Sequence, residues 1–216
     1  MFNTIFPKIH KEGYRFLAIS ILATFAVLFF SKFLGLLLLI VTIWVYYFFR
    51  DPERYSISDD SFLVSPADGL ITNISEKSGP EELRLENTTY TKVSVFMNVF
   101  NCHVNRVPVS GKVEEIYYKP GKFLNASLDK ASEENERNYF KIKSKKNNEE
   151  VVIVQIAGLI ARRIVCEVEQ GQELKQGDRI GMIRFGSRVD IYFKNKKVLA
   201  KIGQNVVAGE SIIASV

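Results

Sequence analysis

The sequence predicts a mainly β soluble domain that follows an N-terminal hydrophobic helical hairpin. Three features predict it: a long apolar stretch near the N-terminus, a series of short apolar runs after it, and a glycine-marked pattern that occurs twice near the C-terminus. The 216 residues suffice for one domain of ordinary size plus an appendage. The formal net charge of +5 favours an anionic partner, but it does not choose between nucleic acid and lipid headgroups.

The apolar stretch covers residues 16–49 and holds one charge, Lys32, in 34 positions. A single helix of that length would be about 51 Å long, whereas the hydrocarbon core of a bilayer is about 30 Å thick. Ser31, Lys32 and Gly35 lie in the middle of the stretch. Two short helices joined at this point would remove the excess length, so the sequence predicts a hairpin.

Basic residues flank the stretch on both sides, at Lys8, Lys11, Arg15, Arg50 and Arg54. Positive charge marks the cytoplasmic side of a membrane segment, so both ends are expected there. We therefore expect an anchor in the cell membrane with the soluble domain on its cytoplasmic face. A single tilted span, which would export the domain, is the alternative. The expected organisation is an anchor over residues 1–50, a polar linker over 51–62 and a β-rich catalytic domain over 63–216.

The soluble part alternates short apolar runs, rich in valine and isoleucine, with glycine, proline or charged pairs. Such runs are typical of strands. The clearest are Lys92–Phe96, Val113–Tyr118, Val151–Ala157, Arg163–Val168 and Val189–Phe193. The segment Ala126–Tyr139 is polar and highly charged, and it is interpreted as a loop with helical turns.

An internal repeat lies near the C-terminus. The pattern G-Q-x-[LV]-x-x-G-[DE]-x-I begins at Gly171 and again at Gly203, 32 residues later. Its glycines supply turns and its apolar residues point into a shared core. The pattern is typical of the flattened barrel-sandwich, the hammerhead of biotinyl/lipoyl-type domains.

Three tight turns carry groups that could perform chemistry. Gly186-Ser187 offers a hydroxyl beside a peptide bond that no side chain shields, Asp68 offers a carboxylate in S-P-A-D-G, and His103 offers an imidazole. Together they supply a nucleophile, a base for its proton and a carboxylate to orient that base. The two cysteines form no C-x-x-C pattern, so no metal site is predicted.

These residues leave other classes of protein open. The repeat alone would suit a non-catalytic barrel-sandwich adaptor tethered to the membrane. The three reactive groups would also suit a membrane serine peptidase, although the sequence has no G-x-S-x-G around Ser187.

Five longer motifs carry a resemblance that covers essentially the whole chain: S-P-A-D-G at 65–69, N-x-H-V-N-R-x-P-V-x-G at 101–111, P-G-K-F-L-N-A-x-L-D-K-A-S-E-E-N-E-R-N at 120–138, Q-I-A-G-L-I-A-R-R-I-V-C at 155–166 and R-F-G-S-R-V-D at 184–190. In this order they resemble the phosphatidylserine decarboxylase proenzymes of the short prokaryotic type. The resemblance implies self-cleavage, in which Ser187 attacks the carbonyl of Gly186. The products would be a β chain, residues 1–186, and an α chain, residues 187–216, that begins with a pyruvoyl group made from Ser187.

The resemblance also implies the chemistry of the mature protein. The pyruvoyl group forms a Schiff base with the amine of phosphatidylserine and accepts the electrons released with CO2, so the product is phosphatidylethanolamine. By the same likeness Asp68 and His103 assist the self-cleavage, and His103 is the expected proton donor in decarboxylation. Longer members carry a second histidine where this chain has Arg106, so His103 is a candidate for both roles.

The anionic headgroup of such a substrate needs cations, and the candidates near the motifs are Arg106, Lys122, Arg162, Arg163 and Arg188. The expected cofactor is the pyruvoyl group alone, without a metal. The expected partners are phosphatidylserine in the membrane and the α and β chains for each other, with no nucleic acid; a homo-oligomer is left open.

Overall fold

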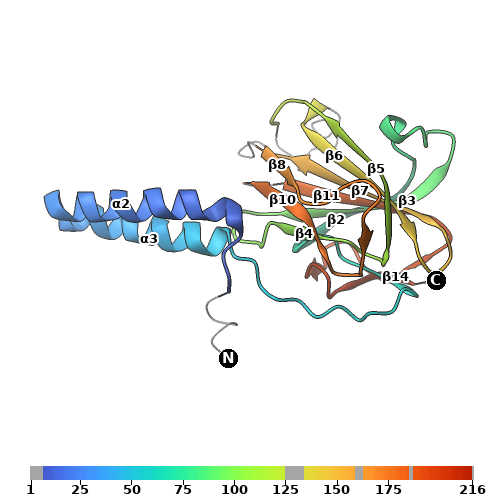
Figure 1. Cartoon of the computed structure of the whole chain (residues 1–216), viewed down its shortest axis with the longest axis horizontal. Helices are drawn as coiled ribbons and strands as arrows, with labels where there is room; N and C mark the ends of the chain where they lie inside the picture. Colours follow the sequence, from blue (N-terminus) through green and yellow to red (C-terminus); the bar gives the residue numbers. More distant parts are fainter. Residues whose placement is uncertain (1–6, 125–133, 159–162, 185–186, 216) are drawn as a thin grey trace. The chain divides into compact units, whose positions relative to one another are not determined.

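The computed structural model describes residues 7–124, 134–158, 163–184 and 187–215 of the chain (Figure 1). It divides into two compact units, Met1–Glu53 and Arg54–Val216. The first unit is helical and the second is built of strands.

The helical unit is an antiparallel hairpin. A short 3-10 turn, η1 (Lys11–Gly13), leads into α2 (Tyr14–Phe30) and α3 (Lys32–Phe48), with Ser31 between the two helices. Each helix has 17 residues, a length of about 25 Å. Figure 1 shows α2 and α3 lying side by side. The predicted helical hairpin is therefore confirmed.

Small and polar side chains hold the two helices together. The hydroxyls of Thr24 and Thr42 lie 2.9 Å apart, and Thr42 also donates to the carbonyl of Ser20. A Cβ atom at Gly35 would lie 2.4 Å from Leu28, so glycine is required for this close approach. By length and composition, the stretch Lys11–Phe30 could cross a membrane.

The second unit contains fourteen strands among the residues that the structure describes. They are β1 (Phe62–Val64), β2 (Gly69–Ser78), β3 (Thr89–Met97), β4 (Val104–Arg106), β5 (Gly111–Lys119), β6 (Arg137–Ser144), β7 (Glu150–Ala157), β8 (Arg163–Cys166), β9 (Glu173–Leu174), β10 (Arg179–Arg184), β11 (Ser187–Phe193), β12 (Lys197–Val198), β13 (Asn205–Val206) and β14 (Ile212–Ser215), with one 3-10 turn, η2 (Glu81–Leu83). Eight form one sheet in the order β13-β2-β3-β11-β7-β6-β5-β9. Two three-stranded sheets, β1-β14-β12 and β4-β10-β8, complete the unit. The prediction of a mainly β domain is confirmed.

One segment differs from its prediction. Residues 137–139 belong to strand β6, whereas the sequence predicted a loop with helical turns over Ala126–Tyr139. Polar side chains made this strand look like a loop, because their partners are distant in sequence. Arg137 forms an ion pair with Glu82, and Asn138 donates to the buried amide of Gln155. Residues 126–133 of that prediction lie outside the described part of the chain.

The core lies on one face of the eight-stranded sheet. Alternate residues of the central strands point into it, among them Val95 on β3, Ile153 on β7 and Ile191 on β11, all fully buried. The opposite face carries a smaller cluster in which Leu83 packs with Tyr139. Each central strand is therefore covered on both faces.

The sheet has an internal symmetry that follows the sequence repeat. At one edge β13 pairs with β2, where Val206 lies opposite Gly69; at the other edge β9 pairs with β5, where Leu174 lies opposite Gly111. Counted inward from the two edges, the strands correspond in pairs, and the central pair is β11 and β7. The two halves of the sheet are thus related by an approximate twofold axis between β7 and β11.

Candidate active site

Ser187 is the first residue of β11 and is fully buried. It lies opposite Met97, the last residue of β3, and opposite Ala157, the last residue of β7. Its side chain points to the core face, the same face as the side chains of Val189 and Ile191. Among the described residues, its hydroxyl has no hydrogen-bond partner. Gly186, the other half of the predicted cleavage site, lies outside the described part of the chain.

His103 directly precedes β4 and is fully buried. Its carbonyl accepts a hydrogen bond from the backbone N–H of Ile183, on the strand that leads directly to Ser187. The segment that leads to His103 starts at Met97, the residue of β3 that lies opposite Ser187. Two separate paths along the chain therefore bring His103 and Ser187 to the same end of the sheet.

The imidazole of His103 has a backbone partner. Its Nδ1 lies 3.0 Å from the backbone carbonyl oxygen of Asn101. Because a carbonyl oxygen can only accept, this contact fits the tautomer of a neutral imidazole that has its proton on Nδ1. The sequence assigned the orientation of this ring to Asp68; the structure places the Asn101 carbonyl at Nδ1.

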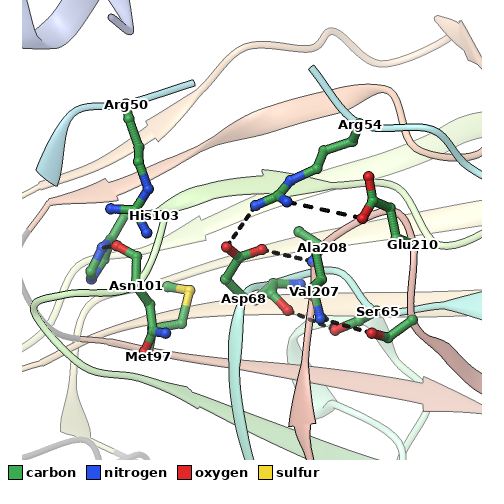
Figure 2. A network of polar contacts seen from close by, with 12 residues as sticks. Arg50, Arg54, Ser65, Asp68, Met97, Asn101, His103, Val207, Ala208 and Glu210 are labelled. Atoms are coloured by element: carbon green, nitrogen blue, oxygen red, sulfur yellow. Dashed lines mark hydrogen bonds and ion pairs between the residues drawn. The ribbon is translucent and has the colours of Figure 1, made fainter. Parts of the chain in front are cut away.

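Asp68 lies in the turn before β2, and 7% of its surface is exposed. One carboxylate oxygen accepts from the Arg54 guanidinium at 2.8 Å, and the other accepts from the backbone N–H of Ala208 at 2.8 Å. Figure 2 shows the carboxylate between these two donors. The carboxylate is therefore fixed in position by a guanidinium and a backbone N–H.

The sheet brings this turn to the end that carries Ser187. Strands β2 and β11 both pair antiparallel with β3, so they run in the same direction and begin at the same end. Two strand spacings, about 10 Å, separate them. A Cβ atom at Gly69 would lie 2.1 Å from the carbonyl oxygen of Phe96, so only glycine allows the chain to enter the sheet directly after Asp68.

The other half of the pseudo-symmetric sheet contains a counterpart of Asp68. Ser110 directly precedes Gly111 as Asp68 precedes Gly69, and the Ser110 hydroxyl accepts from the backbone N–H of Gln176 at 3.1 Å. Gln176 and Ala208 occupy the same position of the two sequence repeats. Asp68 and Ser110 therefore each cap a backbone N–H of a repeat turn, which is a structural role in both halves. Only Asp68 carries a charge at this position.

Arg54 is a site residue that the sequence marks only as a flanking charge of the hydrophobic stretch. It lies 2.8 Å from Asp68 and 4.0 Å from Glu210. Figure 2 draws both contacts as dashed lines. No sequence pattern marks it, because it lies in the segment predicted to be a linker. Its pairing depends on the three-dimensional proximity of that segment to the C-terminal repeat.

Two of the predicted substrate cations are exposed at the end of the sheet that carries Ser187. Arg163 opens β8 opposite Arg184, on the strand that leads to Ser187. Lys122 pairs with Glu134 at 2.9 Å and lies opposite Asn135, whose side chain donates to the carbonyl of Ala157. Arg162 lies outside the described residues.

The other two predicted cations are buried. Arg106 donates to the carbonyl of Gly177 at 2.7 Å, within a turn of the repeat. Arg188 pairs with Asp190 at 2.9 Å, and Lys92 lies 3.9 Å from the same carboxylate. Strand alternation places Arg188 on the face of the sheet opposite Ser187, in the wall of a cavity of about 480 Å³.

Within the described ranges, no group of three or more histidine, cysteine or acidic side chains could hold a metal ion. Ser187 is buried away from water, and its hydroxyl is not engaged by any described residue.

Comparison with known proteins identifies the family of the chain. A model of the family described as phosphatidylserine decarboxylase matches residues 41–214. The phosphatidylserine decarboxylase proenzyme of Pelagibacter ubique (strain HTCC1062) is 62% identical over 214 residues, which cover 99% of each chain. The proenzymes of Rickettsia akari (strain Hartford) and Rickettsia prowazekii (strain Madrid E) are each 49% identical over 99% of this chain and 92% of their own. The chain belongs to the phosphatidylserine decarboxylase family.

Proposed function

We propose that this protein decarboxylates phosphatidylserine to phosphatidylethanolamine, using a pyruvoyl group that it makes from its own Ser187. The observation that carries the proposal is the state of Ser187: it is buried, its hydroxyl is unengaged among the described residues, and it opens a central strand. The names of the relatives, which are called decarboxylase proenzymes, support the same activity.

In the first stage the chain cuts itself. His103 Nε2 accepts the proton of the Ser187 hydroxyl, and the oxygen attacks the carbonyl carbon of Gly186. The peptide C–N bond breaks as its nitrogen gains a proton, which leaves an ester. Loss of the Cα proton of residue 187 then releases the Gly186 carboxylate and leaves dehydroalanine. Water hydrolyses this to the ketone and ammonia.

Asp68 supports this stage electrostatically. A fixed anion favours the imidazolium that forms when His103 takes a proton. Arg54 and the Ala208 N–H hold the carboxylate in its place. The role requires a charge at the same end of the sheet, and it does not require Asp68 to contact the imidazole.

In the second stage the pyruvoyl ketone supplies the electron sink that decarboxylation requires. His103 returns a proton to the carbon that has lost CO2. Lys122 and Arg163 are exposed at this end of the sheet and are our candidates for the anionic headgroup. The helical hairpin would hold the protein at the membrane that contains the lipid, on its cytoplasmic face.

The mass of the purified protein under denaturing conditions tests the proposal. We expect two chains, produced by cleavage of the bond between residues 186 and 187. The α chain should be blocked to Edman degradation and modified by borohydride. A membrane-tethered adaptor or a serine peptidase would instead give one chain of 24.6 kDa with an ordinary serine at position 187. That result would overturn the self-cleavage.

His103→Ala is expected to slow self-cleavage by about 100-fold or more, the usual contribution of a general base. The uncut chain should accumulate, because Ser187 loses its proton acceptor. Added imidazole should partly restore the cut, since it fits the space of the lost ring. The measurement is the fraction cut over time on a denaturing gel. Equal rates for the variant and the wild type would remove His103 from this step.

A further inference from the structure

Three buried amide side chains line the core face of the sheet near Ser187: Asn138 on β6, Gln155 on β7 and Asn105 on β4. Asn105 and Gln155 are fully buried, and Asn138 is 2% exposed. They form a chain in which each amide donates to the next: Asn138 Nδ2 to Gln155 Oε1 at 3.4 Å, then Gln155 Nε2 to Asn105 Oδ1 at 2.8 Å. Donors aligned in one direction polarise one another, which strengthens the last donor.

The last donor in this chain is Asn105 Nδ2, and its acceptor is weak. It lies 3.5 Å from the thioether sulfur of Met97. A thioether is a poor acceptor, so this bond costs little to exchange for a better one. Among the described residues the sulfur is its one acceptor, which is unusual because buried donors normally find an oxygen.

The position of this amide follows from the sheet register. Asn105 Nδ2 contacts Met97 on β3, and Asn105 Oδ1 contacts Gln155 on β7. Strand β11 lies between β3 and β7. Met97 lies opposite Ser187, and Gln155 lies opposite Val189, the next residue of β11 on the same face. The Asn105 carboxamide therefore lies over the core face of β11, with its nitrogen toward Ser187.

We infer that Asn105 is a catalytic residue of the self-cleavage: its Nδ2–H donates to the Ser187 oxygen as that oxygen loses its proton. This inference rests on the proposed function and adds a residue to it. No covalent bond to Asn105 forms; its amide leaves the Met97 sulfur and binds the developing alkoxide. The Ser187 hydroxyl can take up this donor, since no described residue bonds it in the uncut chain. Electrostatic stabilisation of an oxyanion by such a donor typically contributes a factor of 100 to 1,000 to a rate.

The test is Asn105→Asp, which keeps the oxygen that accepts from Gln155 and replaces the donor by a titratable oxygen. Burial raises the pKa of such a carboxyl group. At low pH the protonated acid is again a donor, and at high pH the carboxylate repels the alkoxide. We expect the cleavage rate at pH 8 to fall by about 100-fold. The ratio of variant to wild-type rate should rise toward one as the pH is lowered to 5.5.

Gln155→Glu is a second variant that leaves both Asn105 and Ser187 intact. Its carboxylate would accept from Asn105 Nδ2 and turn that donor away from Ser187, so it should show the same dependence on pH. Gln176→Glu is the matched control: it is a buried amide outside this chain of hydrogen bonds, and its Nε2 donates to the carbonyls of Phe62 and Pro108. It should change the melting temperature without a pH-dependent loss of cleavage.

The measurement is the time course of the cut in full-length chain synthesised in a cell-free system with phospholipid vesicles, together with the melting temperature. A pH-independent ratio for Asn105→Asp and for Gln155→Glu would overturn the inference and assign Asn105 to packing alone. A wild-type chain that stays uncut would instead overturn the proposed function, so the two failures are distinguishable.

Discussion

Replacing Ser187 by alanine is expected to leave one uncut chain of 24.6 kDa that releases no CO2 from phosphatidylserine. The hydroxyl is both the nucleophile of the cut and the atom whose loss generates the ketone. Without it neither chain end nor cofactor forms. The effect should therefore be complete in both assays, and residual decarboxylation would rule out a pyruvoyl group at this position.

The same variant should be as stable as the wild-type precursor, or more stable. Ser187 is fully buried, and no described residue satisfies its hydroxyl. Burying an unsatisfied hydroxyl is unfavourable, so its removal relieves a cost. A melting temperature that does not fall would show that the loss of cleavage is chemical.

Ser94→Ala is the matched control. Ser94 lies on the neighbouring strand β3, is fully buried, and has a hydroxyl that no described residue satisfies. This variant should mature at the wild-type rate. A failure of Ser94→Ala to mature would point to a general sensitivity of the sheet to lost hydroxyls.

Replacing Asp68 by serine is expected to slow self-cleavage by about 100-fold or more while the fold is kept. The pseudo-symmetric half of the sheet shows why the fold should tolerate the change. There Ser110 caps the Gln176 N–H with its hydroxyl, as Asp68 caps the Ala208 N–H with its carboxylate. A serine at position 68 can keep the cap, and it removes the charge together with the ion pair to Arg54.

Ser110→Ala supplies the opposite control. It removes the cap from the half without a charge, so it should lower stability by about 1 kcal/mol and leave the cleavage rate unchanged. The measurements are the fraction cut over time and the melting temperature of each variant. Cleavage of Asp68→Ser at the wild-type rate would show that Asp68 serves the fold alone.

The sequence was sufficient for much of this architecture. Short apolar runs identified the central strands, because a strand covered on both faces needs apolar residues throughout. The repeat at Gly171 and Gly203 identified the symmetric edges, because its glycines are needed at positive φ in the turns. Strand β6 was missed over Arg137–Tyr139, since its polar side chains are satisfied by distant partners that a local pattern cannot show.

The site was predictable only in part, for the same reason. Ser187, Asp68 and His103 stand out through their motifs. Arg54 has no motif, and its pairing with Asp68 depends on a close approach between segments far apart in the chain. The Asn105–Gln155 contact is similar, because it joins residues that are remote in sequence and share a core face only in the folded sheet.

The central place of β11 has a consequence for the folding of the mature protein. Under the proposed cut, the α chain contributes β11, β12, β13 and β14, and β11 is hydrogen-bonded on both sides by strands of the β chain. The precursor folds as one molecule, whereas the cut protein, once denatured, must reassemble from two. Recovery after denaturation should then depend on protein concentration, and dilution should leave more of the β chain unpaired, with a sheet that lacks its middle strand. Maturation would therefore make refolding harder than first folding. Only the uncut precursor carries all the strands of the sheet in one chain, and that precursor is not yet active.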